Sequence, residues 1–202
     1  MPIRDCKVIA VEGTHASGKT TLVHALVSHY RERGIHISCV DESARSSPFM
    51  EDIVLRGRGT FDIVAELDTF AAMLTTQLRA ARHHSVLVAD KTLVNVVAYA
   101  RSLLPERDGP VVDAMLGLCA ATAGLYDAVL YVCDAFDPHQ RGDALRSKVA
   151  SQQADIDIAL RQIAAQAGVV LIDVPRGLTT QERVRWISGH LAEMGVLRPP
   201  QH

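Results

Sequence analysis

Aromatic residues make up only 4% of this 202-residue sequence. So few aromatic side chains leave no obvious platform for stacking a nucleobase, and no basic–aromatic surface of the kind that binds single-stranded nucleic acid. The 21 lysine and arginine residues are offset by 23 aspartate and glutamate residues, which gives a formal net charge of −2. A general nucleic-acid binder carries a basic surplus, so the composition argues against that class.

Long apolar runs are also missing. No stretch approaches the roughly 18 apolar residues of a membrane span, and residues 1–7 carry both signs of charge where a signal peptide would begin. We therefore expect a cytoplasmic protein that does not bind membranes. Its four cysteines form no C-x-x-C pair, and its nine histidines show no metal-ligand spacing. Buried, reduced cysteines are the simplest interpretation.

Short apolar runs alternate with longer amphipathic segments, a pattern typical of an α/β domain with a parallel sheet. Near-continuous runs of Val, Ile and Leu predict strands that helices cover on both faces. The predicted strands are residues 7–11, 35–40, 85–89, 128–133 and 169–174, and the predicted helices are 19–33, 61–84, 95–104, 111–123, 144–167 and 180–194. The expected fold is a single domain over residues 1–202, a three-layer, doubly wound α/β fold with a five-stranded parallel sheet.

A phosphate-binding motif follows the first predicted strand. The pattern G-x-x-x-x-G-K-T occurs once, between an apolar run and an amphipathic helix, and comprises Gly13, Thr14, His15, Ala16, Ser17, Gly18, Lys19 and Thr20. The two glycines let backbone N–H groups turn toward phosphate oxygens, and the helix N-terminus favours the same anion. Lys19 suits the β- and γ-phosphates, and the Thr20 hydroxyl suits Mg²⁺. The motif predicts binding of ATP and Mg²⁺, with Thr21 completing the nucleotide-binding segment.

The motif alone does not distinguish the classes of P-loop protein. A GTPase would carry an N-K-x-D element after a later strand, but the strand at 128–133 is followed by Asp134-Ala135-Phe136-Asp137. The short chain also disfavours a helicase or an AAA-type machine. A small-molecule kinase and a regulatory ATPase both remain open at this point.

Residues 11–22, VEGTHASGKTTL, resemble the opening of thymidylate kinases and their relatives, the deoxynucleoside kinases and ribosylnicotinamide kinases. The resemblance covers most of the chain in layout but only four short segments in residues. It implies a P-loop kinase fold with a small helical lid at about residues 135–150, ATP·Mg²⁺ as phosphoryl donor, and a small-molecule acceptor.

The second segment of the resemblance, Asp41-Glu42-Ser43-Ala44-Arg45, follows the second predicted strand. In deoxynucleoside kinases a glutamate here acts as the base, so the resemblance implies that Glu42 orients or deprotonates the acceptor hydroxyl. Arg45 would hold an anionic group of the acceptor. The alternative is that both are ordinary surface residues.

The third segment begins at the end of the third predicted strand. Asp90 and Tyr99 match the family pattern D-R-x-x-x-x-x-x-A-Y, which implies that Asp90 binds Mg²⁺ and that Tyr99 faces the acceptor. Lys91 departs from the pattern, because it keeps the charge of the family arginine but loses its bidentate fork. Gln77, late in the preceding helix, stands where relatives often place a glutamine that faces the substrate.

The fourth segment lies in the expected lid. Arg141 and Arg146 would close over the transferring phosphoryl group and stabilise its charge. Arg176, after the fifth strand, stands where the chain of such kinases borders the adenine.

These patterns predict an ATP-dependent phosphotransferase for a nucleoside, a nucleoside monophosphate or a related small metabolite. The alternative is a regulatory ATP-binding protein with weak ATPase activity, which the substitution at Lys91 favours. A polynucleotide-end kinase is a third option, disfavoured by the acidic balance. The oligomeric state is open at this point, and the apolar helices 95–104 and 111–123 are the candidate interface of a homodimer.

Overall fold

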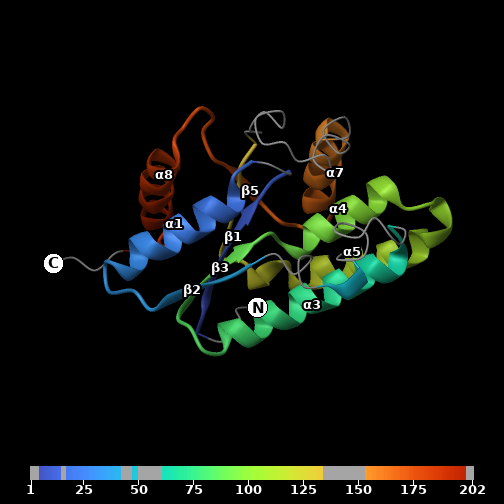
Figure 1. The fold of residues 1–202 in the computed structure, drawn as a ribbon, viewed down its shortest axis with the longest axis horizontal. Coiled ribbons are helices and arrows are strands. Elements are labelled where there is room, and N and C mark those ends of the chain that lie inside the picture. Colours follow the sequence, from blue (N-terminus) through green and yellow to red (C-terminus); the bar gives the residue numbers. More distant parts are fainter. Residues whose placement is uncertain (1–4, 15–16, 42–46, 50–60, 134–152, 199–202) are drawn as a thin grey trace.

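A computed structural model of the chain describes residues 5–14, 17–41, 47–49, 61–133 and 153–198. Its centre is a five-stranded sheet in the order β2-β3-β1-β4-β5, in which all paired neighbours are parallel (Figure 1). The strands are β1 (Lys7–Glu12), β2 (Ile37–Val40), β3 (Val86–Asp90), β4 (Ala128–Tyr131) and β5 (Leu171–Asp173). This confirms the predicted α/β fold with a parallel five-stranded sheet.

The principal helices that the structure describes are α1 (Lys19–Arg31), α3 (Ile63–Ala81), α4 (Leu93–Leu103), α5 (Gly109–Thr122), α7 (Gln153–Gln166) and α8 (Thr180–Glu193). Two short 3₁₀ turns, η2 (Glu106–Asp108) and η3 (Ala123–Leu125), flank α5. The predicted boundaries of strands and helices differ from these by at most three residues, apart from residues 144–152, which lie outside the described residues.

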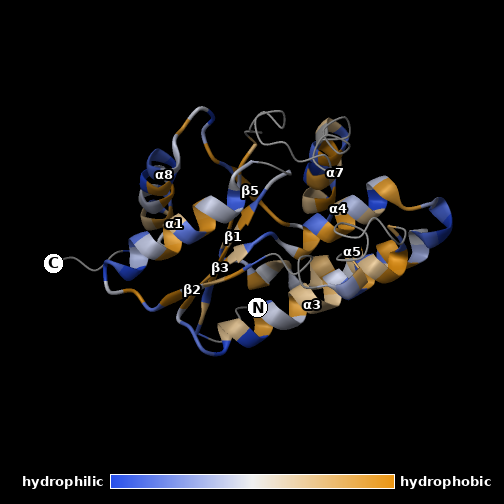
Figure 2. Ribbon diagram, in the orientation of Figure 1, coloured by the Kyte–Doolittle hydropathy of each residue, from blue (hydrophilic) through white to orange (hydrophobic). Residues whose placement is uncertain are grey.

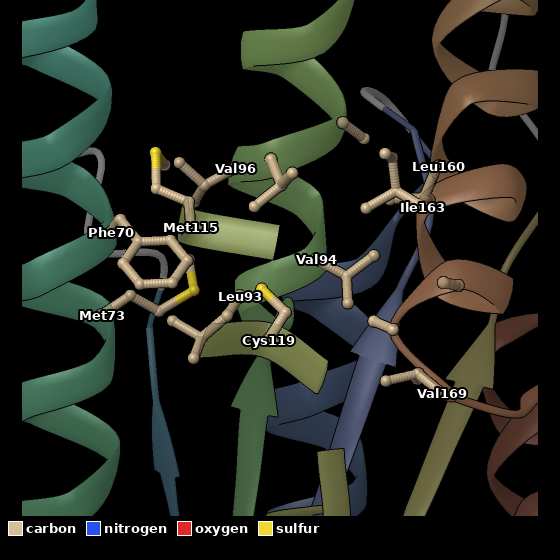
Figure 3. Close-up of a cluster of buried hydrophobic side chains, with 14 of the residues drawn as sticks. Phe70, Met73, Leu93, Val94, Val96, Met115, Cys119, Leu160, Ile163 and Val169 are labelled. Atoms are coloured by element: carbon tan, nitrogen blue, oxygen red, sulfur yellow. The ribbon is translucent and has the colours of Figure 1, made fainter. Parts of the chain in front are cut away.

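Helices cover both faces of the sheet and create two separate cores. On one face α1 and α8 pack on side chains such as Ile9, Val11 and Leu130. On the other face α3, α4, α5 and α7 pack on Ala10 and Tyr131, and Figure 3 shows part of this core. Successive side chains of a strand point to opposite faces, so an uninterrupted apolar run supplies both cores. Figure 2 shows these strands as mainly hydrophobic, whereas the helices carry both kinds of residue.

Helix α3 exposes several of its apolar residues and buries several polar ones. Val64, Leu67 and Leu78 have the helical spacing of an apolar stripe, yet they are 52%, 39% and 41% exposed. The buried face combines apolar Phe70 and Met73, which meet α4 and α5 in Figure 3, with three polar residues: Glu66, Thr69 and Gln77. Buried polar residues on a helix that covers a sheet point to a functional requirement rather than to packing.

The strand register brings the motif residues to one edge of the sheet. Val11 pairs with Asp90 across β1 and β3, and Glu12 pairs with Tyr131 across β1 and β4. The loop after β1 therefore leaves the middle of the sheet at its carboxyl edge, where open α/β sheets bind ligands. No helix in the described part of the chain is long and apolar enough to cross a membrane.

Candidate active site

The loop between β1 and α1 has the backbone geometry that its glycines predict. Gly13 and Gly18 adopt positive φ angles of 141° and 81°, which favour glycine. A Cβ on Gly13 would also lie 2.3 Å from the carbonyl oxygen of Val132, so a side chain is excluded there by space as well as by conformation. Gly18 is the N-cap of α1, so the positive end of that helix faces the loop.

Lys19 is buried at the start of α1, with its ammonium turned into the loop. Its Nζ donates to the carbonyl oxygen of Thr14 and, over 3.2 Å, to Oγ of Ser17. Ser17 Oγ in turn donates to the Thr14 carbonyl over 3.1 Å. The loop thus holds a positive charge among its own oxygens, where an anionic phosphate would be a better partner. Thr21 is exposed on the first turn of α1.

Thr20 and Asp90 meet at the mouth of the loop. The Thr20 hydroxyl donates to Oδ2 of Asp90 over 2.6 Å, which joins the first turn of α1 to the end of β3. Asp90 is only 2% exposed, and within the described part of the chain its Oδ1 is buried without a hydrogen-bond partner. A buried carboxylate oxygen without a partner is costly, and a cation would satisfy it. The hydroxyl and carboxylate oxygens are the donors that Mg²⁺ prefers, so these residues fit the ion.

Glu12, at the end of β1, organises the backbone around the loop. Its side chain is fully buried, and its two oxygens accept four hydrogen bonds. Oε1 accepts from the Gly13 N–H over 2.8 Å and from Nδ2 of Asn95 over 2.7 Å. Oε2 accepts from the N–H and the hydroxyl of Thr92 over 2.9 and 2.7 Å. One carboxylate therefore ties the phosphate loop to the start of α4. The sequence carried a signal for it, a carboxylate closing a strand that is otherwise apolar.

A second residue that the sequence analysis missed supports the loop from α8. Arg183 is 4% exposed, and its Nη1 donates to the carbonyl oxygen of Ser17 over 3.1 Å. A buried guanidinium beside the loop adds positive potential where phosphates are expected. No local sequence pattern distinguishes this arginine from the others, because the contact spans 166 residues of sequence.

Lys91 adopts a backbone conformation that is unusual for its residue type. Its φ is +82°, and it is the one non-glycine residue with positive φ in the described part of the chain. Its N–H donates to the Val11 carbonyl over 3.1 Å, and its carbonyl accepts from Nε2 of Gln77 over 3.2 Å. The buried ammonium lies 5.7 Å from the ring centroid of Tyr99. Such strain persists where the surroundings over-determine it, which is common at functional sites.

Gln77 is held by protein groups on both sides of its amide. Besides the bond to Lys91, its Oε1 accepts from the Tyr126 hydroxyl over 2.9 Å. These contacts position the turn after β3. The substrate contact predicted for Gln77 stays a prediction, and it would require the amide to exchange one of these partners.

Glu66 is a third buried residue that the sequence analysis did not single out. It lies on the first turn of α3, is 2% exposed, and faces the same region as Lys91. Burial raises the pKa of its carboxyl from 4.5 to about 8, and the positive charge of Lys91 opposes the rise. A carboxyl that is easily protonated near neutral pH is a candidate functional group. The signal in the sequence was an acidic residue four positions before Phe70, within the buried stripe.

A match to a known domain family establishes the family of this chain. A family described as an AAA domain matches residues 8–183, which include the phosphate loop, Asp90 and Arg183. The chain belongs to this AAA domain family. The short length of the chain disfavours a large AAA-type machine, but it does not argue against an AAA domain. A comparison with curated protein sequences gives no significant match.

Two solved structures from the group that the sequence resembles share the fold of this AAA domain protein. A thymidylate kinase from Candida albicans, described as having broad substrate specificity, shares 17% identity at a TM-score of 0.68, over 95% of this chain and 93% of that one. The NadR protein, solved in complex with NR, shares 15% identity at a TM-score of 0.71, over 99% of this chain. The chain spans about half of NadR, 54% of its length. At these identities the likeness establishes the fold.

Of the remaining predicted site residues of this AAA domain protein, the structure describes only some. Arg176 is exposed after β5 and donates from Nε to Sγ of Cys133 over 3.2 Å, beside the end of β4. Several predictions lie outside the described residues: those for His15, Ala16, Glu42, Arg45, Arg141, Arg146 and the lid at about 135–150.

One of the two helices predicted to form a dimer interface does not suit that role. Residues 93–100 of α4 are all buried within the chain, because α4 packs against α3, α5 and α7. Only α5 of the predicted pair exposes large apolar side chains, Val111 and Leu118. The α4 part of the prediction is therefore wrong, and the homodimer itself stays a prediction.

Proposed function

We propose that this protein is an ATP-dependent kinase that phosphorylates a nucleoside, a nucleoside monophosphate or a related small metabolite. The observation that carries the proposal is the pairing of Thr20 with Asp90 beside the phosphate loop, which leaves one buried carboxylate oxygen without a partner. A protein that only bound phosphate would gain nothing from this oxygen, whereas a metal-assisted phosphotransferase needs it.

Thr20 and Asp90 would hold Mg²⁺, which neutralises charge on the transferring phosphoryl group. The backbone N–H groups of the loop and the N-terminus of α1 would bind the phosphates. Lys19 would leave the Thr14 carbonyl and contact the β- and γ-phosphates. Because these groups are already in place on rigid elements, catalysis would come mainly from positioning and electrostatics.

The acceptor would lie on the side of α3 and α4, between Glu66, Lys91 and Tyr99. Helix α3 runs past the end of β3, so its first turn lies beyond the carboxyl edge of the sheet, where an acceptor must lie to reach the γ-phosphate. Lys91 would attract an anionic or electron-rich group, although its point charge cannot grip a phosphate bidentately. Glu42 and Arg45 remain the proposed base and anion ligand on sequence grounds, and Arg141 and Arg146 the proposed lid cations.

One observation favours a second candidate, a regulatory ATP-binding protein with weak ATPase activity. The Lys91 ammonium lies near the Tyr99 ring and under the electrostatic influence of Glu66, so it is already engaged within the protein. In a kinase that bound its acceptor through this position, the ammonium would have to turn toward the acceptor.

The four cysteines are all free, which is compatible with the predicted cytoplasmic, reducing environment.

The test is ADP release from ATP and Mg²⁺ across a panel of nucleosides, nucleoside monophosphates and phosphorylated cofactors. We expect at least one acceptor to raise turnover above the intrinsic rate, and Lys19→Ala to abolish the increase. Lys7→Ala is the matched control, because Lys7 is an exposed lysine at the opposite end of β1, paired with Asp127. Tight ATP binding without any response to acceptors would favour the regulatory protein.

A further inference from the structure

Three metal-binding side chains of different chemistry converge at the edge of the sheet, and none of them belongs to the Thr20–Asp90 pair. His24 comes from α1, Cys39 from the edge strand β2, and Asp41 from the residue just beyond that strand. Sγ of Cys39 lies 3.7 Å from Nδ1 of His24, and Nε2 of His24 lies 3.4 Å from Oδ1 of Asp41. One ligand atom from each of the three lies within 4.8 Å of the others.

Each separation is close to one edge of a tetrahedral zinc site. With Zn–S, Zn–N and Zn–O bonds of about 2.3, 2.05 and 2.0 Å, tetrahedral ligands lie about 3.6 Å apart for sulfur and nitrogen, and about 3.3 Å apart for nitrogen and oxygen. The two separations involve different nitrogens of the His24 ring, and only one nitrogen can bind a given ion, so the exposed ring would have to turn to bring a single nitrogen close to both partners. The side chains of His24 and Asp41 are 56% and 65% exposed, which leaves them free to adjust and leaves the site open to solvent.

The local charge also favours a cation. Cys39 is half-buried, and its thiol has a raised pKa because of burial first and of the negative charge of Asp41 second. Arg31 opposes this rise, and Asp90 adds a smaller contribution in the same direction as Asp41. A divalent cation bound here would offset the negative charges of Asp41 and of a Cys39 thiolate.

We propose that His24, Cys39 and Asp41 form a binding site for a divalent transition metal, with zinc as the natural candidate. Thiolate and imidazole ligands select zinc over Mg²⁺ and Ca²⁺, which prefer oxygen ligands. Three protein ligands leave a fourth position for water or for a further ligand. Binding replaces the Cys39 S–H bond by a metal–sulfur bond and releases the proton to solvent. Sequence spacing hides this site, because the ligands come from two elements and are 15 and 2 residues apart.

The metal would join α1 to the end of β2. His24 lies one helical turn after Thr20 on the same face of α1, so the site is near the proposed Mg²⁺ residues but shares none of them. Asp41 directly precedes Glu42 in the sequence, the residue proposed as base. The ion would therefore fix the point at which the chain leaves the sheet toward Glu42, and it would stabilise the folded state by mass action.

The same three groups in line, carboxylate, imidazole and thiol, could instead activate Cys39 as a nucleophile. Rapid alkylation of Cys39 at neutral pH in metal-free protein, with no metal binding, would overturn the metal site in favour of the nucleophile.

The experiment is a titration of metal-free, untagged, reduced protein with Co²⁺, followed by competition with Zn²⁺. We expect one equivalent of Co²⁺ to bind with a thiolate-to-cobalt charge-transfer band, and Zn²⁺ to displace it. Cys39→Ser should abolish the band, whereas Cys133→Ser, which removes another half-buried free thiol, should retain it. His24→Ala should weaken binding at least tenfold, and His83→Ala, at an exposed histidine, should not.

A second readout is thermal unfolding of the same variants. Zn²⁺ should raise the midpoint of the wild type and of His83→Ala by the same amount, and that of His24→Ala by less. The proposal is overturned if Co²⁺ gives no thiolate band, if the band survives in Cys39→Ser, or if binding requires millimolar metal. These readouts do not depend on kinase activity, so they stand apart from the test of the proposed function.

Discussion

Replacing Glu12 by glutamine changes one carboxylate oxygen into an amide group at the most densely hydrogen-bonded side chain of the site. In the wild type each oxygen accepts two hydrogen bonds, one pair from Gly13 and Asn95 and the other from Thr92. The amide nitrogen of the glutamine must face one of these two pairs of donors. Because the nitrogen is itself a donor, it cannot accept their hydrogen bonds. Either orientation therefore loses two hydrogen bonds at a fully buried position.

The cost follows from leaving buried donors without acceptors. Each such donor costs about 1–3 kcal/mol, and bonds to charged groups lie at the upper end. The Thr92 hydroxyl and the Asn95 amide can turn toward other partners, but the backbone N–H groups cannot. We therefore expect Glu12→Gln to lower the free energy of unfolding by roughly 2–5 kcal/mol.

The assay is equilibrium unfolding in urea, with the midpoint and slope compared between variants. Glu193→Gln is the matched control, because Glu193 is an exposed glutamate near the end of α8 and should change stability by less than about 0.5 kcal/mol. A double-mutant cycle with Asn95→Ala isolates the contact between the two side chains, and we expect a coupling energy of about 1–3 kcal/mol. A loss below 1 kcal/mol for Glu12→Gln would refute the account of Glu12 as the organiser of the loop, whereas the coupling with Asn95 shows which pair of donors the glutamine amide nitrogen faces.

Three further predictions use other residues of the site. Gly13→Ala should destabilise the protein by at least about 2 kcal/mol in urea unfolding, because its Cβ would overlap the Val132 carbonyl. The control Gly117→Ala, in α5, should be neutral or stabilising, because a Cβ there would have no atom within 4 Å. Equal effects of the two substitutions would contradict the steric argument. Burial raises the pKa of Glu66 from 4.5 to about 8. The stability that the bound proton contributes is therefore fully present below pH 4.5, and it is lost as the pH rises through about 8. Glu66→Gln should therefore gain stability relative to the wild type between about pH 5 and 8, by up to roughly 1.4 kcal/mol per pH unit, and a parallel pH profile would show that Glu66 is ionised throughout. Arg183→Lys should weaken ATP binding about tenfold in calorimetric titration, since lysine cannot reproduce the guanidinium contact with the loop, and an unchanged affinity would remove Arg183 from the site.

The sequence predicted the elements well because each buried strand is a nearly continuous apolar run. Residues 8–11, for example, are apolar and fully buried between two layers of helices, and the glycine pattern that follows them has one compatible strand–loop–helix geometry. The proximity of Thr20 and Asp90 was also predictable, because the start of α1 and the end of β3 both lie at the carboxyl edge of the sheet. Local pattern and tertiary structure agree at these points.

The sequence did not predict which polar residues are buried, because hydrophobic periodicity gives no information about them. On α3, apolar periodicity does not separate Val64 and Leu67, which are exposed, from Phe70 and Met73, which share the buried face with Glu66 and Gln77. Arg183 contacts the loop across 166 residues, a separation that no local pattern encodes. The cluster around His24 was missed in the same way, since its ligands meet only when α1 packs beside β2.

The central claim is that the phosphate loop and the Thr20–Asp90 pair transfer a phosphoryl group to a small acceptor. Its most direct test is detection of the phosphorylated acceptor itself, by mass spectrometry, after incubation with ATP and Mg²⁺ and the acceptor that most stimulates ADP release. The account predicts a product whose mass rises by one phosphoryl group, formed by the wild type and by Lys7→Ala but not by Lys19→Ala or Asp90→Asn. ADP release without phosphorylated product from any acceptor, or product formation undiminished in Asp90→Asn, would contradict it.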